Sequence, residues 1–180
     1  MISSSQGEWI RSVLVQYEDS LTRYAAHITG DIERARDVVQ DTFLRLCSQK
    51  RSWVGDHIAQ WLFTVCRNRA LDVREKENRM DSPFEVELEA QPAPQPALST
   101  VLEQKEQLSR VLRVVATLPP NQQEVIRLKF QNGLSYREIS GVTNLSVSNV
   151  GFLIHSGLKT VRQKINAWSQ ASPTPMRRIK

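Results

Sequence analysis

Apolar residues in the first half of the chain recur at steps of three and four, the spacing of one buried face on an α-helix. Residues 9–28 carry such a stripe, which consists of Trp9, Val13, Leu14, Tyr17, Leu21, Tyr24, Ala25 and Ile28. Gly30 predicts the end of this helix, and Asp31 predicts the N-cap of a second one. The inward face of the second helix is expected to consist of Ala35, Val38, Val39, Thr42, Phe43 and Leu46. A third helix is predicted over residues 57–79.

The polar positions of these helices are the first candidates for function. Opposite the apolar face of the second helix lie Asp37, Gln40, Asp41 and Arg45, and a solvated surface is the default interpretation of such a set. The second half of the third helix interleaves Lys and Arg with amides and acids, directly after an aromatic segment. This mixture suits bases that strand opening exposes. A basic helix end is also typical where cations simply favour the C-terminal dipole.

Residues 118–165 have the pattern of a helix-turn-helix. Ser135 and Glu138 have the spacing of a capping box, so a helix is predicted to begin there. Asn144 lies where the chain must turn, and Asn tolerates a left-handed backbone. A second helix is predicted next, with an inward face of Val150, Leu153, Ile154, Leu158, Val161 and Ile165. A unit of this kind places its second helix in the major groove of DNA.

The outward residues of that second helix form a predicted reading face, consisting of Ser148, Asn149, Phe152, His155, Ser156, Lys159 and Arg162. A helical hairpin inside another kind of domain would show the same spacing. The charge distribution favours DNA. Residues 1–81 hold 12 basic and 12 acidic side chains, 82–107 hold 1 and 5, and 108–180 hold 11 and 2. A net charge of +9 on the segment with the helix-turn-helix is typical of phosphate binding.

These patterns predict an all-α protein of two small helical domains joined by a flexible acidic linker. The expected parts are a first domain over 1–80, a Pro-containing linker over 81–105, a helix-turn-helix domain over 106–168 and a basic disordered tail over 169–180. The chain has no secretion signal and no apolar run near the ~18 residues that cross a bilayer, so a cytoplasmic location is expected. Cys47 and Cys66 are predicted to be buried, reduced thiols, and no metal site or cofactor is expected.

Three stretches of the chain resemble the extracytoplasmic-function group of bacterial sigma factors, the specificity subunits of RNA polymerase. Residues 37–46 (DVVQDTFLRL) resemble the helix with which the family binds the polymerase clamp, and residues 61–72 (WLFTVCRNRALD) resemble its promoter-melting helix. Residues 118–126 (LPPNQQEVI), followed by 134–139 (LSYREI), resemble the family's fourth conserved region. The three motifs occur in the family's order and together span most of residues 10–165.

The resemblance implies a role for each of these surfaces. The expected clamp-binding residues are Asp37, Gln40, Asp41, Leu44 and Arg45, so the polar face of the second helix becomes an interface rather than solvated surface. The expected minus-ten DNA-binding residues are Arg67, Asn68, Asp72, Arg74 and Lys76, where the family captures a flipped base. The expected minus-thirty-five residues are Arg137, Ser148, Asn149, Phe152, His155, Lys159 and Arg162. Implied partners are core RNA polymerase at its clamp and flap regions, promoter DNA and an anti-sigma factor.

The predicted second helix differs from related recognition helices, which usually carry basic or small residues, and is unusually apolar. The positions concerned are Gly151, Phe152, Leu153, Ser156 and Gly157. Phe152 either contacts a thymine methyl group or packs against a neighbouring helix, and the sequence favours neither. Gly151 and Gly157 within a helix each cost about 1 kcal/mol relative to Ala, so small residues are required there or the helix is marginal.

Two other function classes remain open from the sequence. A repressor or activator would use the same helix-turn-helix on duplex DNA without being a polymerase subunit, and a helical adaptor would bind only proteins. The sequence contains no phosphate-cradling glycine loop, metal-ligand cluster or nucleophile motif, so neither an enzyme nor a small-molecule substrate is expected.

Overall fold

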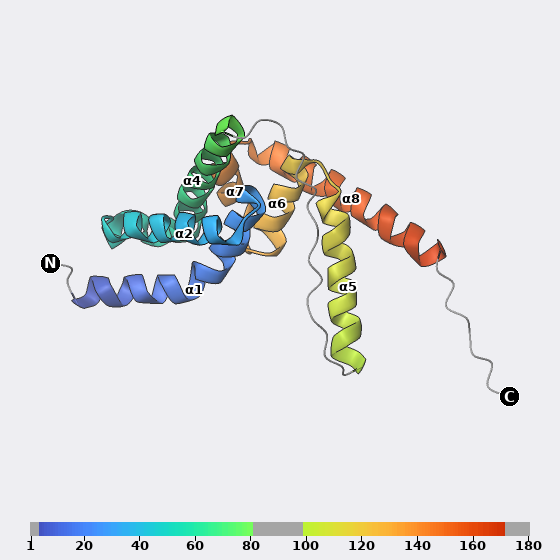
Figure 1. The fold of residues 1–180 in the computed structure, drawn as a ribbon, viewed down its shortest axis with the longest axis horizontal. Helices are drawn as coiled ribbons and strands as arrows, with labels where there is room; N and C mark the ends of the chain where they lie inside the picture. Colours follow the sequence, from blue (N-terminus) through green and yellow to red (C-terminus); the bar gives the residue numbers. More distant parts are fainter. Residues whose placement is uncertain (1–3, 81–98, 172–180) are drawn as a thin grey trace. The chain divides into compact units, whose positions relative to one another are not determined.

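The structure is a computed structural model that describes residues 4–80 and 99–171. Within these two ranges every regular element is helical, which confirms the all-α prediction (Figure 1). Residues 81–98 of the predicted linker and 172–180 of the predicted tail lie outside the described part of the chain, whereas residues 169–171, predicted as disordered tail, are helical. The elements are α1 (Ser4–Thr29), α2 (Ile32–Cys47), α3 (Arg51–Val54), the 3₁₀ turn η1 (Gly55–His57), α4 (Ile58–Met80), α5 (Ser99–Ala116), α6 (Pro120–Phe130), α7 (Tyr136–Thr143) and α8 (Val147–Ala171).

Local chemistry accounts for where these helices begin and end. Gly30 adopts φ +74°, a conformation that glycine accepts without strain, and ends α1. Asp31 caps α2, because its carboxylate accepts a hydrogen bond of 2.8 Å from the backbone N–H of Arg34. The buried face of α2 is the set that the sequence predicts, from Ala35 to Leu46.

By its internal contacts the described chain divides into two compact units. The first combines residues 4–80 with 127–147, and the second combines 99–126 with 148–171. In the first unit α1, α2 and α4 pack on one another around fully buried side chains such as Leu21, Leu46 and Leu62 (Figure 1). Tyr24 meets Phe63 edge to face, with ring centroids 5.3 Å apart. This three-helix core fixes which faces of α2 and α4 remain outside.

The segment between α2 and α4 is more structured than the sequence suggests. It contains α3 and η1, and α4 begins directly after them at Ile58. Val54 is buried whereas Trp53 beside it is exposed, so one side chain anchors the turn and the other projects from it. Periodicity could not reveal these elements, because four residues are too short to show a helical repeat.

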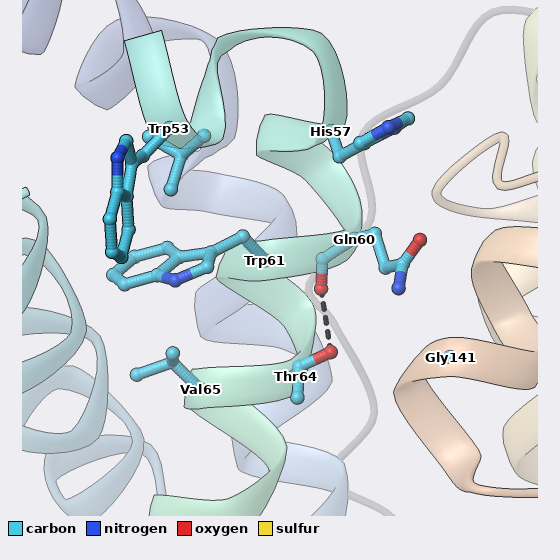
Figure 2. A pocket seen from close by; sticks show the side chains of 8 residues that line it. Trp53, His57, Gln60, Trp61, Thr64, Val65 and Gly141 are labelled. Carbon is cyan, nitrogen blue, oxygen red and sulfur yellow. Dashed lines mark hydrogen bonds between the residues drawn. The ribbon is translucent and has the colours of Figure 1, made fainter. Parts of the chain in front are cut away.

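Helix α7 belongs to the first unit, where it packs against α4, whereas the sequence groups it with the C-terminal helices. Gly141 of α7 faces Gln60 of α4 (Figure 2). A Cβ atom at position 141 would lie 2.1 Å from Nε2 of Gln60 in its present position, so a glycine permits this close approach. The predicted division at residue 106 stays a prediction.

The second unit has a core of its own, formed by α5, part of α6 and α8. Its buried cluster consists of Val114, Val115, Leu118, Ile126 and Val161. Helix α5 begins at Ser99, earlier than the predicted linker end at 105, so the last part of that range is helical rather than extended.

Candidate functional site

The outward face of α2 is the first of three candidate surfaces. Asp37, Gln40 and Arg45 are exposed and Asp41 is half-exposed, as their positions opposite the buried face require. Leu44 is 60 % exposed in the middle of them. The face therefore combines exposed apolar area with charged and amide side chains, a composition that a protein–protein contact can use.

Two ion pairs connect α2 to α4. The guanidinium Nε of Arg69 donates to Oδ2 of Asp41 over 2.8 Å, and Nη1 of Arg34 donates to Oε2 of Glu77 over 2.5 Å. Asp41 therefore has a partner within the chain, and its carboxylate helps to hold α2 against α4. The sequence did not single out Arg69 for this role, because a pair 28 residues apart leaves no local signal.

A cleft lies between α1 and α2 next to this face. It has a volume of about 410 Å³, and its lining includes Ile10, Leu14, Phe43, Leu44 and Cys47. Cys47 is exposed, so the prediction of two buried thiols is wrong for this residue and correct for Cys66. The reason is its position, because Cys47 follows the buried Leu46 by one residue and the helix turns it out of the core. Burial raises the pKa of the Cys66 thiol to about 12, while a hydrogen bond with Thr42 acts in the opposite direction.

The second candidate surface is the C-terminal half of α4. Asn68, Asp72, Arg74 and Lys76 are exposed, and Arg67 is half-buried. The opposite face is held in the core by Cys66 and Ala70, both fully buried. The helix thus presents cations, an amide and a carboxylate outward from a rigid support. The structure places these side chains on the surface, and their contact with DNA stays a prediction.

An aromatic cleft precedes this surface at the start of α4. Figure 2 shows the rings of Trp53 and Trp61 close together beside Val65, whereas His57, Gln60 and Thr64 extend from the side of the helix that faces Gly141. The cleft measures about 280 Å³, and Trp53 is 83 % exposed. Thr64 donates its hydroxyl to the carbonyl of Gln60 over 2.7 Å and so presents a methyl group rather than a free hydroxyl donor. Two indole faces beside a polar helix suit the stacking of planar bases.

Sequence reasoning missed Trp53 and did not assign Trp61 to a site. The sequence did contain a feature that could have identified Trp53, because it is an isolated aromatic residue in a short polar segment after a helix end. What the sequence lacked was its neighbour, since only the turn through α3 and η1 brings position 53 beside position 61.

Helix α7 begins with the predicted capping box. The Ser135 hydroxyl accepts from the backbone N–H of Glu138 over 3.2 Å, and the Glu138 carboxylate accepts from the backbone N–H of Ser135 over 2.7 Å. The Ser135 hydroxyl also donates to the Glu138 carboxylate over 2.6 Å. This bond and the one from the Ser135 backbone N–H lower the pKa of Glu138, and the charges of His57 and Lys129 add to the effect. Asn144 ends the helix with φ +58°, as predicted. Arg137 lies exposed in the first turn.

The third candidate surface is the outward face of α8. Ser148, Asn149, Phe152, His155, Lys159 and Arg162 are all exposed. Val150, Ile154 and Val161 are buried on the other side, as predicted, but Leu158 is 39 % exposed and was wrongly placed in the inward set. Position 158 lies one residue beyond the buried Gly157, so its side chain turns toward solvent.

Packing explains why a glycine occupies position 157, which the sequence alone left open. A Cβ atom there would lie 2.7 Å from Cδ1 of Ile126, so an alanine would force the end of the Ile126 side chain to shift. The α5–α6 connection is fixed as well, because the Gln123 amide donates to the carbonyls of Ala116 and Leu118 over 3.0 and 2.8 Å. Together these contacts hold the exposed face of α8 on a packed support.

Across residues 4–80 and 99–171 no group of His, Cys, Asp and Glu has the arrangement of a metal site. The described helices also include none with the length and apolar character that a membrane span requires.

Two conserved family regions match the chain. Residues 13–80 match Sigma-70 region 2, and residues 108–161 match Sigma-70, region 4. The chain is 28 % identical over 166 residues to the ECF RNA polymerase sigma factor SigM of Bacillus subtilis (strain 168), an alignment that covers 88 % of this chain and 93 % of SigM. It is 28 % identical over 165 residues to the ECF RNA polymerase sigma factor SigL of Mycobacterium tuberculosis (strain ATCC 35801 / TMC 107 / Erdman), covering 89 % and 90 %.

A solved structure has a similar fold. It is the co-crystal structure of the sigma factor RpoE in complex with the anti-sigma factor NepR from Bartonella quintana, with a TM-score of 0.66 and 20 % identity. The match covers 87 % of this chain and 96 % of that chain. Because both Sigma-70 regions occur in order and these two relatives align over at least 90 % of their length, this chain belongs to the extracytoplasmic-function group of bacterial RNA polymerase sigma factors.

Proposed function

We propose that the chain binds core RNA polymerase, directs it to promoters through a minus-thirty-five and a minus-ten element, and helps to open the DNA. The observation that carries this proposal is that both Sigma-70 regions of the chain present exposed polar helix faces on packed supports. The work is binding rather than bond chemistry. Because RNA polymerase acts on the chromosome, this function takes place in the cytoplasm.

The α2 face would bind the polymerase clamp. Leu44 supplies exposed apolar area at its centre, and Asp37, Gln40 and Arg45 surround it with polar groups. Burial of one leucine side chain contributes about 1.5–3 kcal/mol, which is enough to make Leu44 a dominant contact. Asp41 would act partly by positioning, since it holds Arg69 and thereby the α2–α4 arrangement.

The α4 surface and the aromatic cleft would act together on the minus-ten element. Arg74 and Lys76 provide charge for phosphates, and Asn68 provides an amide for base edges. Trp53 and Trp61 provide indole faces on which an unstacked base can be held. Stacking contributes about 1–3 kcal/mol per base, which is comparable to the cost of unstacking a base from a duplex. Base capture of this kind favours the open state.

The exposed face of α8, with Arg137 of α7, would read the minus-thirty-five element. Lys159 and Arg162 lie on the exposed face at a spacing suited to phosphates, and Ser148 and Asn149 lie in the first turn of α8. We also propose an anti-sigma factor as a partner, as in the Bartonella complex. The polymerase flap is the proposed partner of the second unit.

Transcription with purified components tests the proposal. Core RNA polymerase supplemented with the chain is expected to initiate at a cognate promoter, and permanganate footprinting is expected to show unpaired thymines near the minus-ten element. The double variant Arg74→Ala/Lys76→Ala is expected to lose most of the footprint. Arg23→Ala, an exposed basic residue of α1 outside the proposed surfaces, serves as the matched control. Duplex binding without any affinity for core polymerase would instead indicate an ordinary repressor.

A further inference from the structure

The exposed face of α8 carries a large apolar side chain at its centre. Phe152 is 67 % exposed, and Ser148, His155 and Lys159 lie on the same face at helical steps of three and four. Two interpretations of Phe152 follow from the sequence, packing against a neighbouring helix or contact with DNA. The exposure of its ring removes the first, because the buried positions of this helix are Val150, Ile154 and Val161.

An exposed phenyl ring forgoes most of the stabilisation that burial would give a phenylalanine. Its neighbours on the face are polar or cationic, so the ring is not part of a broad apolar patch of the kind that binds another protein. The ring projects from the second turn of α8, and the N-terminal part of a recognition helix is where side chains reach base edges. On a helix that enters the major groove, a single apolar group among polar side chains suits a small apolar target.

The floor of the major groove offers one group of that kind. Guanine, cytosine and adenine present hydrogen-bond donors and acceptors there, whereas thymine adds its C5-methyl group. Ser148 precedes Phe152 by one helical turn and is small, so it leaves space on the N-terminal side of the ring. Lys159 and Arg162, two to three turns further along, carry charge suited to phosphates that would fix the register.

We propose that Phe152 determines minus-thirty-five specificity by packing its ring on the C5-methyl group of one thymine. This inference rests on the proposed function, since it assumes that α8 enters the major groove. It adds that one position of the element is read through an apolar contact, which distinguishes thymine from cytosine and from uracil.

The test uses holoenzyme reconstituted from core polymerase and the full chain. Promoter fragments are first selected by binding, and each thymine of the minus-thirty-five element is then replaced singly by deoxyuridine, which removes only the methyl group. Losing one buried methyl contact is expected to weaken binding about fourfold at one position. Phe152→Ala is expected to bind the thymine and deoxyuridine fragments equally at that position. Phe152→Leu is expected to retain part of the difference.

Phe130→Ala is the matched control, because Phe130 is also an exposed phenylalanine, at 60 %, but lies on α6. It is expected to keep the fourfold difference, and circular dichroism of each variant checks that α8 remains folded. If wild-type holoenzyme binds promoters but no single deoxyuridine weakens it, or Phe152→Ala retains the difference, the inference is overturned. If the chain forms no holoenzyme or selects no promoter, the proposed function itself fails. Loss of anti-sigma binding rather than promoter binding in Phe152→Ala would identify a protein contact instead.

Discussion

Replacing Gly157 by alanine tests whether close packing sets the position of α8. The new Cβ atom would lie 2.7 Å from Cδ1 of Ile126, about 1 Å inside the ~3.5–4.0 Å separation that two carbon atoms prefer. Overpacking of this kind costs about 1–3 kcal/mol, whereas alanine gains about 1 kcal/mol over glycine in a helix. The expected net change in the free energy of unfolding is a destabilisation of about 0–2 kcal/mol, measured on the full chain by urea unfolding.

A double-mutant cycle separates these two contributions. Ile126→Val removes the Cδ1 atom and alone costs about 0.5–1.5 kcal/mol. In the Gly157→Ala background the same change removes the clash, so the two substitutions are expected to couple by about 1–3 kcal/mol in the stabilising direction. Gly133→Ala is the control, because its φ of +71° causes strain with no atom within 4 Å of the new Cβ. It is expected to be additive with Ile126→Val. Additivity within about 0.5 kcal/mol for Gly157→Ala would refute the packing argument.

Three further predictions concern the α2 face, the capping box and the two cysteines. Leu44→Asp is expected to weaken binding to core polymerase about tenfold or more in a titration, without lowering the melting temperature, because the side chain is 60 % exposed. Ser135→Ala is expected to cost about 1 kcal/mol of unfolding free energy at pH 7. The pKa of Glu138 is lowered in the fold, so its carboxylate stabilises the folded state above the unfolded pKa, and this stabilisation is lost as pH falls through the folded pKa. Ser135→Ala is therefore expected to lose less unfolding free energy on acidification than the unaltered chain. A thiol reagent at pH 8 is expected to label Cys47 alone in the folded chain and both cysteines in denaturant, since burial raises the pKa of Cys66 to about 12; two fast thiols in the folded state would contradict this.

The helical pattern of the sequence was sufficient for α1, α2, α4, α7 and α8. Each inward position predicted for α2 is buried. A helix that packs one face against a core needs apolar residues at steps of three and four, and this spacing can be recognised in its own sequence. The caps at Asp31 and Ser135 were equally predictable, since a capping hydrogen bond spans only three residues. Cys47 and Leu158 were misplaced because each lies at the edge of an apolar stripe, where helical periodicity alone does not decide burial.

The sequence by itself determined α1, α2, α4, α7 and α8, the caps at Asp31 and Ser135, and the residues of the three polar faces, because these depend on interactions between residues three or four positions apart. Only the tertiary structure decided which distant residues meet. The Asp41–Arg69 ion pair, the aromatic cleft of Trp53 and Trp61, and the approach of Gly157 to Ile126 all join positions that local spacing does not relate. The exposure of Phe152 belongs to the same class, since whether a side chain packs or projects depends on what the rest of the fold places beside it.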